Sequence, residues 1–278
     1  MTKISVIGLG APGVKIAREF KKYSQYKVFL IDSEPLKDAN SYRLKEYNHP
    51  ELYEKNPPKL KTFFRGMKGD ILFILSGAGI VSGAALVILE QLKHCNITLI
   101  YIKPDTELLG EVRRMQERVA YNVLQEYARS AVFKEMVLIS NPALEVIMGE
   151  VPLAEYYSRL NEMIASSLHM VNVFNNSDSF MDNFSEIAET ARISTLGIVN
   201  LDTGDEKPFF PLDSVTDKVY YYGISAKTLE SDAAFYGRLK EQIKSKKTAN
   251  TNVSYGIFKT SYNDNYAFAL SKSRKIQP

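Results

Sequence analysis

The sequence contains a single cysteine, Cys95, so no internal disulfide can form and a reducing compartment such as the cytoplasm is expected. Its three histidines, His49, His94 and His169, lie far apart without the spacing of zinc ligands, and no metal-ligating residue is predicted. Every apolar run is shorter than the ~20 residues of a membrane span, and the first residues suggest a strand instead of a signal peptide. The net charge of +3 is small, and basic residues are interspersed with acidic ones. We therefore expect a cytoplasmic protein that contacts neither membrane nor nucleic acid directly.

Strand-like and helix-like segments alternate through the first half of the chain. Short apolar runs predict buried strands at residues 3–8, 27–32, 70–76, 97–102 and 135–140. Helices are predicted between them, near residues 14–22, 83–94 and 110–130. This succession favours a Rossmann-like α/β fold with a doubly wound parallel sheet.

The pattern changes in the second half of the chain. Two helices are predicted at residues 153–174 and 184–194. Beyond residue 200, strands are predicted at 218–225, 252–259 and 266–272, with a helix near 231–244. These segments predict two domains: residues 1–200 with the parallel sheet and the long connecting helix, and a smaller α+β domain at 201–278.

A first glycine loop joins the first predicted strand to its helix. Gly8, Gly10 and Gly13 follow the pattern G-x-G-x-x-G, and Asp32 ends the next strand. Such glycines let the backbone approach a phosphate at a helix N-terminus, and the acidic side chain can bind a ribose. Taken alone, this pattern also fits an NAD-dependent oxidoreductase, or close packing of helix against strand with no ligand. Against the oxidoreductase, no Lys, His or Tyr forms an evident hydride-transfer site.

A second glycine loop, "GAGIVSGAA" at residues 77–85, follows the third strand and opens another helix. It resembles the G-G-G-T-G-T-G-A-A signature of the tubulin/FtsZ family. The resemblance implies that GTP or GDP binds between this loop and the first one, through the residues Gly77, Ala78, Gly79, Ser82 and Gly83. Two phosphate loops around one nucleotide would explain why the chain has two.

Two further segments resemble nucleotide contacts of that family. "KPDTELLGEVRR" resembles the loop P-F-x-F-E-G-x-x-R, with one residue more. Pro104, Glu107 and Arg113 then correspond to positions at the ribose and base. "LAEYYSRLNEMIASSL" resembles the helix that stacks an aromatic ring on guanine and binds its edge, which implies roles for Tyr157, Asn161 and Glu162.

"GIVNLDTGDE" resembles the family's synergy loop, G-x-x-N-x-D-x-x-D, with Asn200, Asp202 and Asp205 at the expected spacing. The resemblance implies that these residues act on GTP bound by the next subunit of a head-to-tail homopolymer, together with Mg²⁺, so that hydrolysis requires assembly. It also implies a cytoskeletal role, with a DNA- or virion-linked adaptor as a further partner. Alternatively, this segment is an ordinary turn without a catalytic role, since Asn, Asp and Gly favour turns.

The chain departs from the family pattern at both glycine loops. Ile80 and Val81 replace the Thr and Gly of the signature, and Ala11 and Pro12 replace glycines in the first loop. These changes remove hydroxyl and N–H donors that would contact phosphate. The alternative function is therefore a degenerate family member that assembles without hydrolysing GTP.

Overall fold

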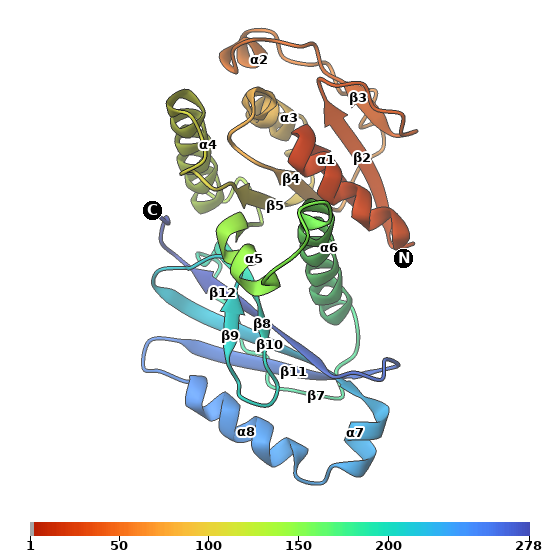
Figure 1. Cartoon of the computed structure of the whole chain (residues 1–278), viewed down its shortest axis with the longest axis vertical. Helices are drawn as coiled ribbons and strands as arrows, with labels where there is room; N and C mark the ends of the chain where they lie inside the picture. Colours follow the sequence, from red (N-terminus) through yellow and green to blue (C-terminus); the bar gives the residue numbers. More distant parts are fainter. Residues whose placement is uncertain (1–2) are drawn as a thin grey trace. The chain divides into compact units, whose positions relative to one another are not determined.

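The computed structural model describes residues 3–278. The chain divides into two compact units, Met1–Ala165 and Ser166–Pro278 (Figure 1). The division falls within α6 (Tyr156–Asn175), so the second half of this helix and β8 (Ile193–Val199) belong to the second unit. It differs in this respect from the predicted boundary at residue 200.

The first unit contains a six-stranded sheet in which every pairing is parallel. Its strands, in spatial order, are β3 (Ser41–Arg43), β2 (Tyr26–Asp32), β1 (Ile4–Leu9), β4 (Asp70–Leu75), β5 (Asn96–Lys103) and β6 (Glu135–Ser140). The inner strands are buried almost throughout, which explains their continuous apolar runs. The predicted parallel α/β sheet is confirmed. Because β1 lies between β2 and β4, the loops that follow β1 and β4 are neighbours at the carboxyl edge, where ligands bind in such sheets.

Helical segments connect these strands. They are α1 (Gly10–Glu19), η1 (Phe20–Lys22), α2 (Glu51–Lys55), η2 (Ile80–Ala84), α3 (Ala85–Gln91), α4 (Glu111–Arg129) and α5 (Asn141–Met148). The predicted helix at 83–94 is shorter than expected and begins as a 3₁₀ turn. In α4, side chains such as Tyr121 and Leu124 are buried, whereas Val112, Met115 and Val119 are exposed on another face.

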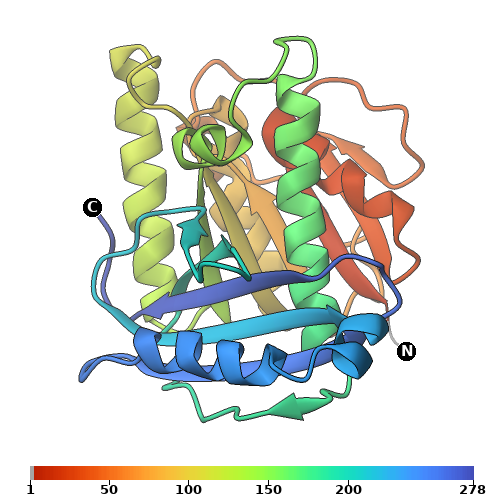
Figure 2. The ribbon, with the colours of Figure 1, turned by 60° about the horizontal axis from the view of Figure 1, so that its bottom comes forward.

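The second unit is built on an antiparallel sheet with one parallel pair, β10 and β11. The strand order is β8, β12 (Tyr266–Ser273), β10 (Val215–Ser225), β11 (Asn252–Thr260) and β7 (Met181–Asp182), and β9 (Glu206–Pro208) pairs with β8. Two helices, α7 (Ala226–Ser231) and α8 (Phe235–Lys246), connect β10 to β11, and α8 lies along one face of this sheet (Figure 2). The predicted strands and the helix near 231–244 are confirmed.

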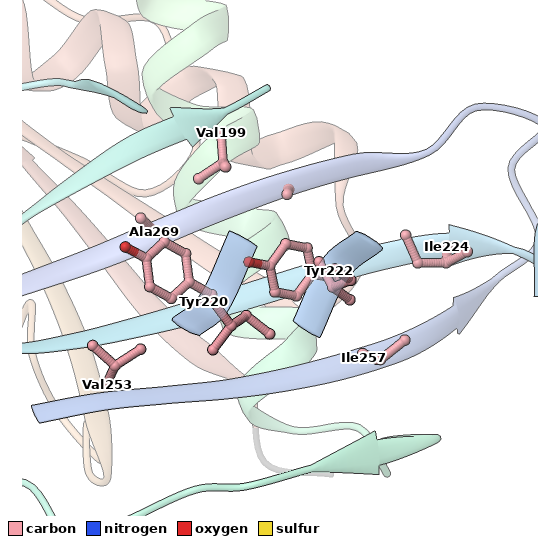
Figure 3. Close-up of a cluster of buried hydrophobic side chains, with 10 residues drawn as sticks. Val199, Tyr220, Tyr222, Ile224, Val253, Ile257 and Ala269 are labelled. Carbon is pink, nitrogen blue, oxygen red and sulfur yellow. The ribbon is translucent and has the colours of Figure 1, made fainter. Parts of the chain in front are cut away.

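The core of the second unit lies between α8 and the sheet. Tyr220, Tyr222 and Ile224 alternate along β10 and face the same side, with Val253 and Ile257 on the neighbouring strand (Figure 3). Leu239 and Ile243, one helical turn apart on α8, pack into this cluster. Tyr220 and Tyr222 therefore belong to this core, whereas Tyr221 between them stacks on Phe174.

The helix predicted at residues 184–194 is wrong. This part of the chain instead runs along the edge of the sheet: Asn183 N–H donates to Tyr255 O over 2.9 Å, and Ser185 hydrogen-bonds Ser254. A β-carbon on Gly256 would lie 2.5 Å from the Phe184 ring, so this ring covers bare backbone. Pairing with an open strand edge satisfies backbone groups that a short, exposed helix would leave to water.

No helix within residues 3–278 has the length and apolar character that crossing a membrane requires.

Candidate functional site

The first glycine loop turns tightly between β1 and α1. Gly10 has φ +70°, a left-handed conformation that favours glycine. Gly8 and Gly13 serve packing: a β-carbon on Gly8 would lie 2.4 Å from Gly13 O, and one on Gly13 would lie 2.3 Å from Ile74 O. The helix therefore meets β1 and β4 backbone to backbone, so two of the three glycines have a structural role whether or not a ligand binds.

The second glycine loop has a similar division of roles. Gly77 is packed so closely that a β-carbon would lie 2.1 Å from the Tyr101 hydroxyl, and one on Gly83 would lie 2.4 Å from Pro50 O. Ala78 between them is half-buried, and Gly79 is exposed with nothing within 4 Å of a β-carbon. Packing therefore explains the glycines at positions 77 and 83 of this loop but does not explain Gly79.

The two loops lie side by side. A β-carbon on Gly10 would lie 3.8 Å from Val81 Cβ, so the valine that replaces a signature glycine faces the first loop directly. Neither α1 nor η2 has a side-chain cap at its start, and α1 has no acidic residue in its first turn. Uncapped helix starts leave N–H groups that attract an anion. The uncapped starts of α1 and η2 make this junction the candidate position for a phosphate group.

Side chains fix the second loop in place. The Ser82 hydroxyl lies 2.8 Å from Gly77 O and 2.6 Å from Gly79 O. Gln116 on α4 donates to Gly79 O over 2.6 Å. Sequence reasoning assigned Ser82 to the nucleotide and missed Gln116, whose only signal was its place on a helix that follows the next strand. Ser82 thus already serves the loop's own carbonyls.

A buried polar cluster that includes Tyr101 packs against Gly77 of the second glycine loop. The Tyr101 hydroxyl donates to Glu117 Oε1 over 3.0 Å, and the Lys103 ammonium lies 3.9 Å from the centre of the Tyr121 ring. Burial raises the pKa of the Glu117 carboxyl, which Lys103 and the Tyr101 hydrogen bond partly offset. Burial also lowers the pKa of the Lys103 ammonium. These groups lie on β5 and α4, and they are not among the predicted site residues.

Asp32 lies at the carboxyl end of β2, beside the first loop. Its side chain is 5% exposed. Its Oδ1 accepts a hydrogen bond from Ser33 N–H over 2.8 Å, and within residues 3–278 it has no ion-pair partner. The structure thus places Asp32 at the end of the second strand, as predicted, with its side chain buried.

The loop after β5 contains Pro104 and Glu107, and Arg113 follows on α4. Pro104 is half-buried, whereas Glu107 and Arg113 are exposed. Arg114, and not Arg113, closes the loop: it donates to Thr106 O over 3.1 Å and to Leu109 O over 3.2 Å. Arg113 is therefore left available to a ligand, as its predicted role requires, while its neighbour fixes the backbone.

Tyr157 on α6 is brought towards α1 of the first unit. The Lys15 ammonium lies 5.5 Å from the centre of the Tyr157 ring, which is 60% exposed. One turn further along, Asn161 is buried, and Glu162 forms an ion pair with Lys22 over 3.1 Å. The structure thus places Tyr157 and Asn161 on the helix as predicted, and it shows that Glu162 already has a cationic partner.

Asn200, Asp202 and Asp205 lie in the second unit, in the turn between β8 and β9. Asn200 Oδ1 accepts from the N–H groups of Asp202 over 2.9 Å and Thr203 over 3.0 Å, which is an Asx turn. Asp202 and Asp205 are exposed. The expected turn therefore forms, and it holds two carboxylates outwards while the side chain of Asn200 is used within it.

Contacts from the neighbouring elements make this turn rigid. Gln242 on α8 donates to Leu201 O over 2.8 Å, and Lys246 donates to Gly204 O over 2.7 Å. Glu206 directly follows Asp205, and its carboxylate accepts hydrogen bonds from Lys218 over 2.6 Å and from Tyr220 over 2.7 Å. Burial would raise the pKa of the Glu206 carboxyl, but these donors together hold it below its ordinary value.

Within residues 3–278, no three His, Cys, Asp or Glu side chains gather as a metal-binding group.

Comparison with known proteins identifies the fold. No protein-family model and no curated protein matches the sequence. Among solved structures, the chain is similar to an FtsZ dimer from M. jannaschii, with a TM-score of 0.69 and 16% identity over 98% of this chain and 88% of that one. It is also similar to TubZ of Bacillus thuringiensis serovar israelensis in a GTPγS-form protofilament, with a TM-score of 0.74 and 15% identity over 100% and 88%. A helical two-stranded TubZ-Bt filament gives 0.73 and 14% over 100% and 85%.

The chain is therefore an α/β protein with two glycine loops at the switch point of a parallel sheet. More specifically, it has the tubulin/FtsZ fold, over its whole length. The predicted resemblance is confirmed at that level.

Proposed function

We propose that this protein is a tubulin/FtsZ-like cytoskeletal protein of the cytoplasm that binds GTP at the two glycine loops and polymerises head to tail. The observation that carries the proposal is the junction of Gly10 with Val81, where two uncapped helix starts meet at the carboxyl edge of the sheet. An NAD-binding fold would use the first loop alone and would leave the second without a role. The TubZ and FtsZ neighbours, described as protofilaments, filaments and a dimer, support self-association.

In this proposal the residues of the first unit bind the nucleotide. The backbone at Gly10 and at residues 77–83 would contact the phosphates, and Glu107 would bind the ribose. Asp32 would help to hold a Mg²⁺ ion, which would neutralise the phosphate charge. Tyr157 offers an exposed ring for stacking on the base, and Asn161 is placed one turn further along the helix. Mg²⁺ would supply charge neutralisation, since no basic residue comes from the glycine loops themselves.

Hydrolysis would be performed on the nucleotide of the next subunit. Phosphoryl transfer depends on positioning and charge handling more than on covalent chemistry by the protein. The turn at Asn200 presents Asp202 and Asp205 on a backbone fixed by Gln242 and Lys246. Asp205 would orient the attacking water, and Asn200 would position the turn through its hydrogen bonds. An adaptor linked to DNA or to a virion would then connect the filament to its cargo.

One observation favours the alternative, assembly without hydrolysis. The Val81 side chain lies against Gly10, where the family pattern has glycine, and Pro12 has no N–H to donate. Both changes reduce the room and the donors available to the β- and γ-phosphates. In this alternative the fold and the filament remain, and the pocket binds GDP or nothing.

Nucleotide binding distinguishes a tubulin/FtsZ-like protein from an NAD-dependent oxidoreductase. We expect GTP and GDP to bind in calorimetric titration and to be favoured over NAD. Tyr157→Ala should weaken binding by about 1–3 kcal/mol, the usual value of base stacking on an aromatic ring. Tyr262→Ala is the matched control, because this ring is exposed to the same extent and is not among the predicted nucleotide contacts. NAD binding in preference to GTP would reject the proposal, and equal losses in the two variants would reject the role of Tyr157.

A further inference from the structure

A strongly basic segment runs from Lys55, the last residue of α2, to Lys68. It contains no acidic residue and five cationic ones: Lys55, Lys59, Lys61, Arg65 and Lys68. All five are exposed, and within residues 3–278 none forms an ion pair. Since the whole chain carries only +3, the rest of the molecule is net negative and this segment is a local patch. The expectation that basic residues are interspersed with acidic ones does not hold within this segment, although Glu54 and Asp70 flank it.

The backbone of the basic segment is fixed on the first unit. Its apolar side chains, Leu60, Phe64 and Met67, are buried. Gln91 at the end of α3 accepts from Leu60 N–H and donates to Pro58 O, both over 3.0 Å. The cations therefore project from an ordered scaffold, which lowers the entropy that a binding partner must offset.

An apolar pocket of about 960 Å³ lies directly beside these cations. Its apolar lining includes Leu86 and Val87 of α3 and, beyond them, Tyr127, Val132 and Phe133. Its charged lining consists of Lys59, Lys61, Lys93, Glu54 and Glu90, of which Lys93 and Glu90 pair with each other, so unpaired lysines outnumber carboxylates at the rim. Val132 is 45% exposed and Tyr127 is 40% exposed, although both are apolar or aromatic. No residue of this pocket belongs to the glycine loops, so the proposed nucleotide site does not explain it.

We propose that the basic segment and this pocket form a docking surface for an acidic, amphipathic segment of another protein. Its Leu or Phe side chains would enter the pocket beside Val132, and its carboxylates would pair with Lys59, Lys61 and their neighbours. The pocket is recessed and the segment's own apolar residues point inwards, so nothing protrudes to insert into a lipid bilayer. Nucleic acid would use the cations and leave the apolar pocket unfilled.

The test uses the full-length protein and a display library of short peptides of unbiased composition. Peptides selected on the wild type are then measured against Lys59→Glu/Lys61→Glu and against Val132→Glu. The charge-matched control is Lys240→Glu/Lys247→Glu, two exposed lysines of the second unit. Thermal unfolding of each variant shows that it is folded.

We expect the selected peptides to combine acidic residues with Leu or Phe, and their affinity to fall about tenfold or more in the Lys59/Lys61 variant and to be lost in Val132→Glu. The control should bind as the wild type does, and added salt should weaken binding. The proposal is overturned if no peptide is enriched, or if the Lys59/Lys61 variant binds as well as the control. It is also overturned if phosphatidylserine vesicles or a DNA duplex bind in a Lys59/Lys61-dependent way and no peptide does.

Discussion

At Gly13 the backbone of α1 lies so close to strand β4 that the effect of adding a side chain on stability can be predicted. A β-carbon at this position would lie 2.3 Å from Ile74 O and 3.1 Å from Ile74 C. The opposing atoms belong to the backbone of β4 and cannot rotate away. Gly13→Ala therefore forces α1 to move off the sheet by roughly 1 Å, which opens the packing around Val14 and Ala17.

Two effects oppose one another in Gly13→Ala. Alanine is favoured over glycine inside a helix by about 1 kcal/mol. Overpacking against a rigid neighbour costs about 1–3 kcal/mol and occasionally more. Because the overlap here is with backbone, we expect the upper end of that range and a net loss of about 2 kcal/mol, which lowers Tm by about 4–8 °C for a unit of this size.

Thermal and guanidinium unfolding measure this loss, with Gly79→Ala as the control. Gly79 has φ −92° and no atom within 4 Å of a β-carbon, so its substitution should change stability by less than about 0.5 kcal/mol. If Gly13→Ala were as stable as the wild type and only nucleotide binding fell, the packing explanation of this glycine would be refuted.

The remaining predictions concern the turn between β8 and β9. Asp205→Ala should keep nucleotide binding and stability, because within the turn the exposed carboxylate contacts only Thr203. It should lower turnover by about a hundredfold or more, because the carboxylate that orients the attacking water is gone. Unchanged turnover would remove Asp205 from the mechanism. Asn200→Ala should remove both Asx-turn hydrogen bonds and increase hydrogen exchange at residues 201–204, and unchanged exchange would contradict the turn's role. Glu206→Gln should lower stability at neutral pH, because the folded state holds the pKa of this carboxyl below its ordinary value of 4.5. The stabilisation is present above that value and is lost as the pH falls through the lower folded pKa, so the two unfolding curves should converge in acid, and a constant difference would contradict the assignment.

Much of the first unit could be predicted from sequence because its strands are buried on both faces. Such strands appear as unbroken apolar runs, and each glycine loop marks the point where a strand becomes a helix. The spatial order of the strands, with β1 between β2 and β4, came from the structure and was not predicted. What the spacing could not give was the reason for each glycine: the structure shows that Gly8, Gly13 and Gly77 are fixed by packing, and Gly10 by its positive φ.

The errors and omissions arise from contacts distant in sequence. Residues 184–194 contain helix-forming Glu and Ala, but the backbone just before them hydrogen-bonds to the open edge of β11, about 70 residues further along the chain. Gln116 is invisible as a site residue until α4 is seen against the second loop. The basic segment at residues 55–68 was missed from the sequence, because its cations alternate with apolar residues whose burial only the structure shows.

The most direct test of the proposed function is GTP turnover measured across a range of protein concentrations with Mg²⁺, with light scattering recorded on the same sample. A nucleotide site completed by the Asn200–Asp205 turn of the next subunit predicts a threshold concentration above which turnover and scattering rise together. Turnover strictly proportional to protein concentration, without scattering, would contradict a shared site. Scattering without any turnover would instead support a filament whose altered glycine loops no longer hydrolyse GTP.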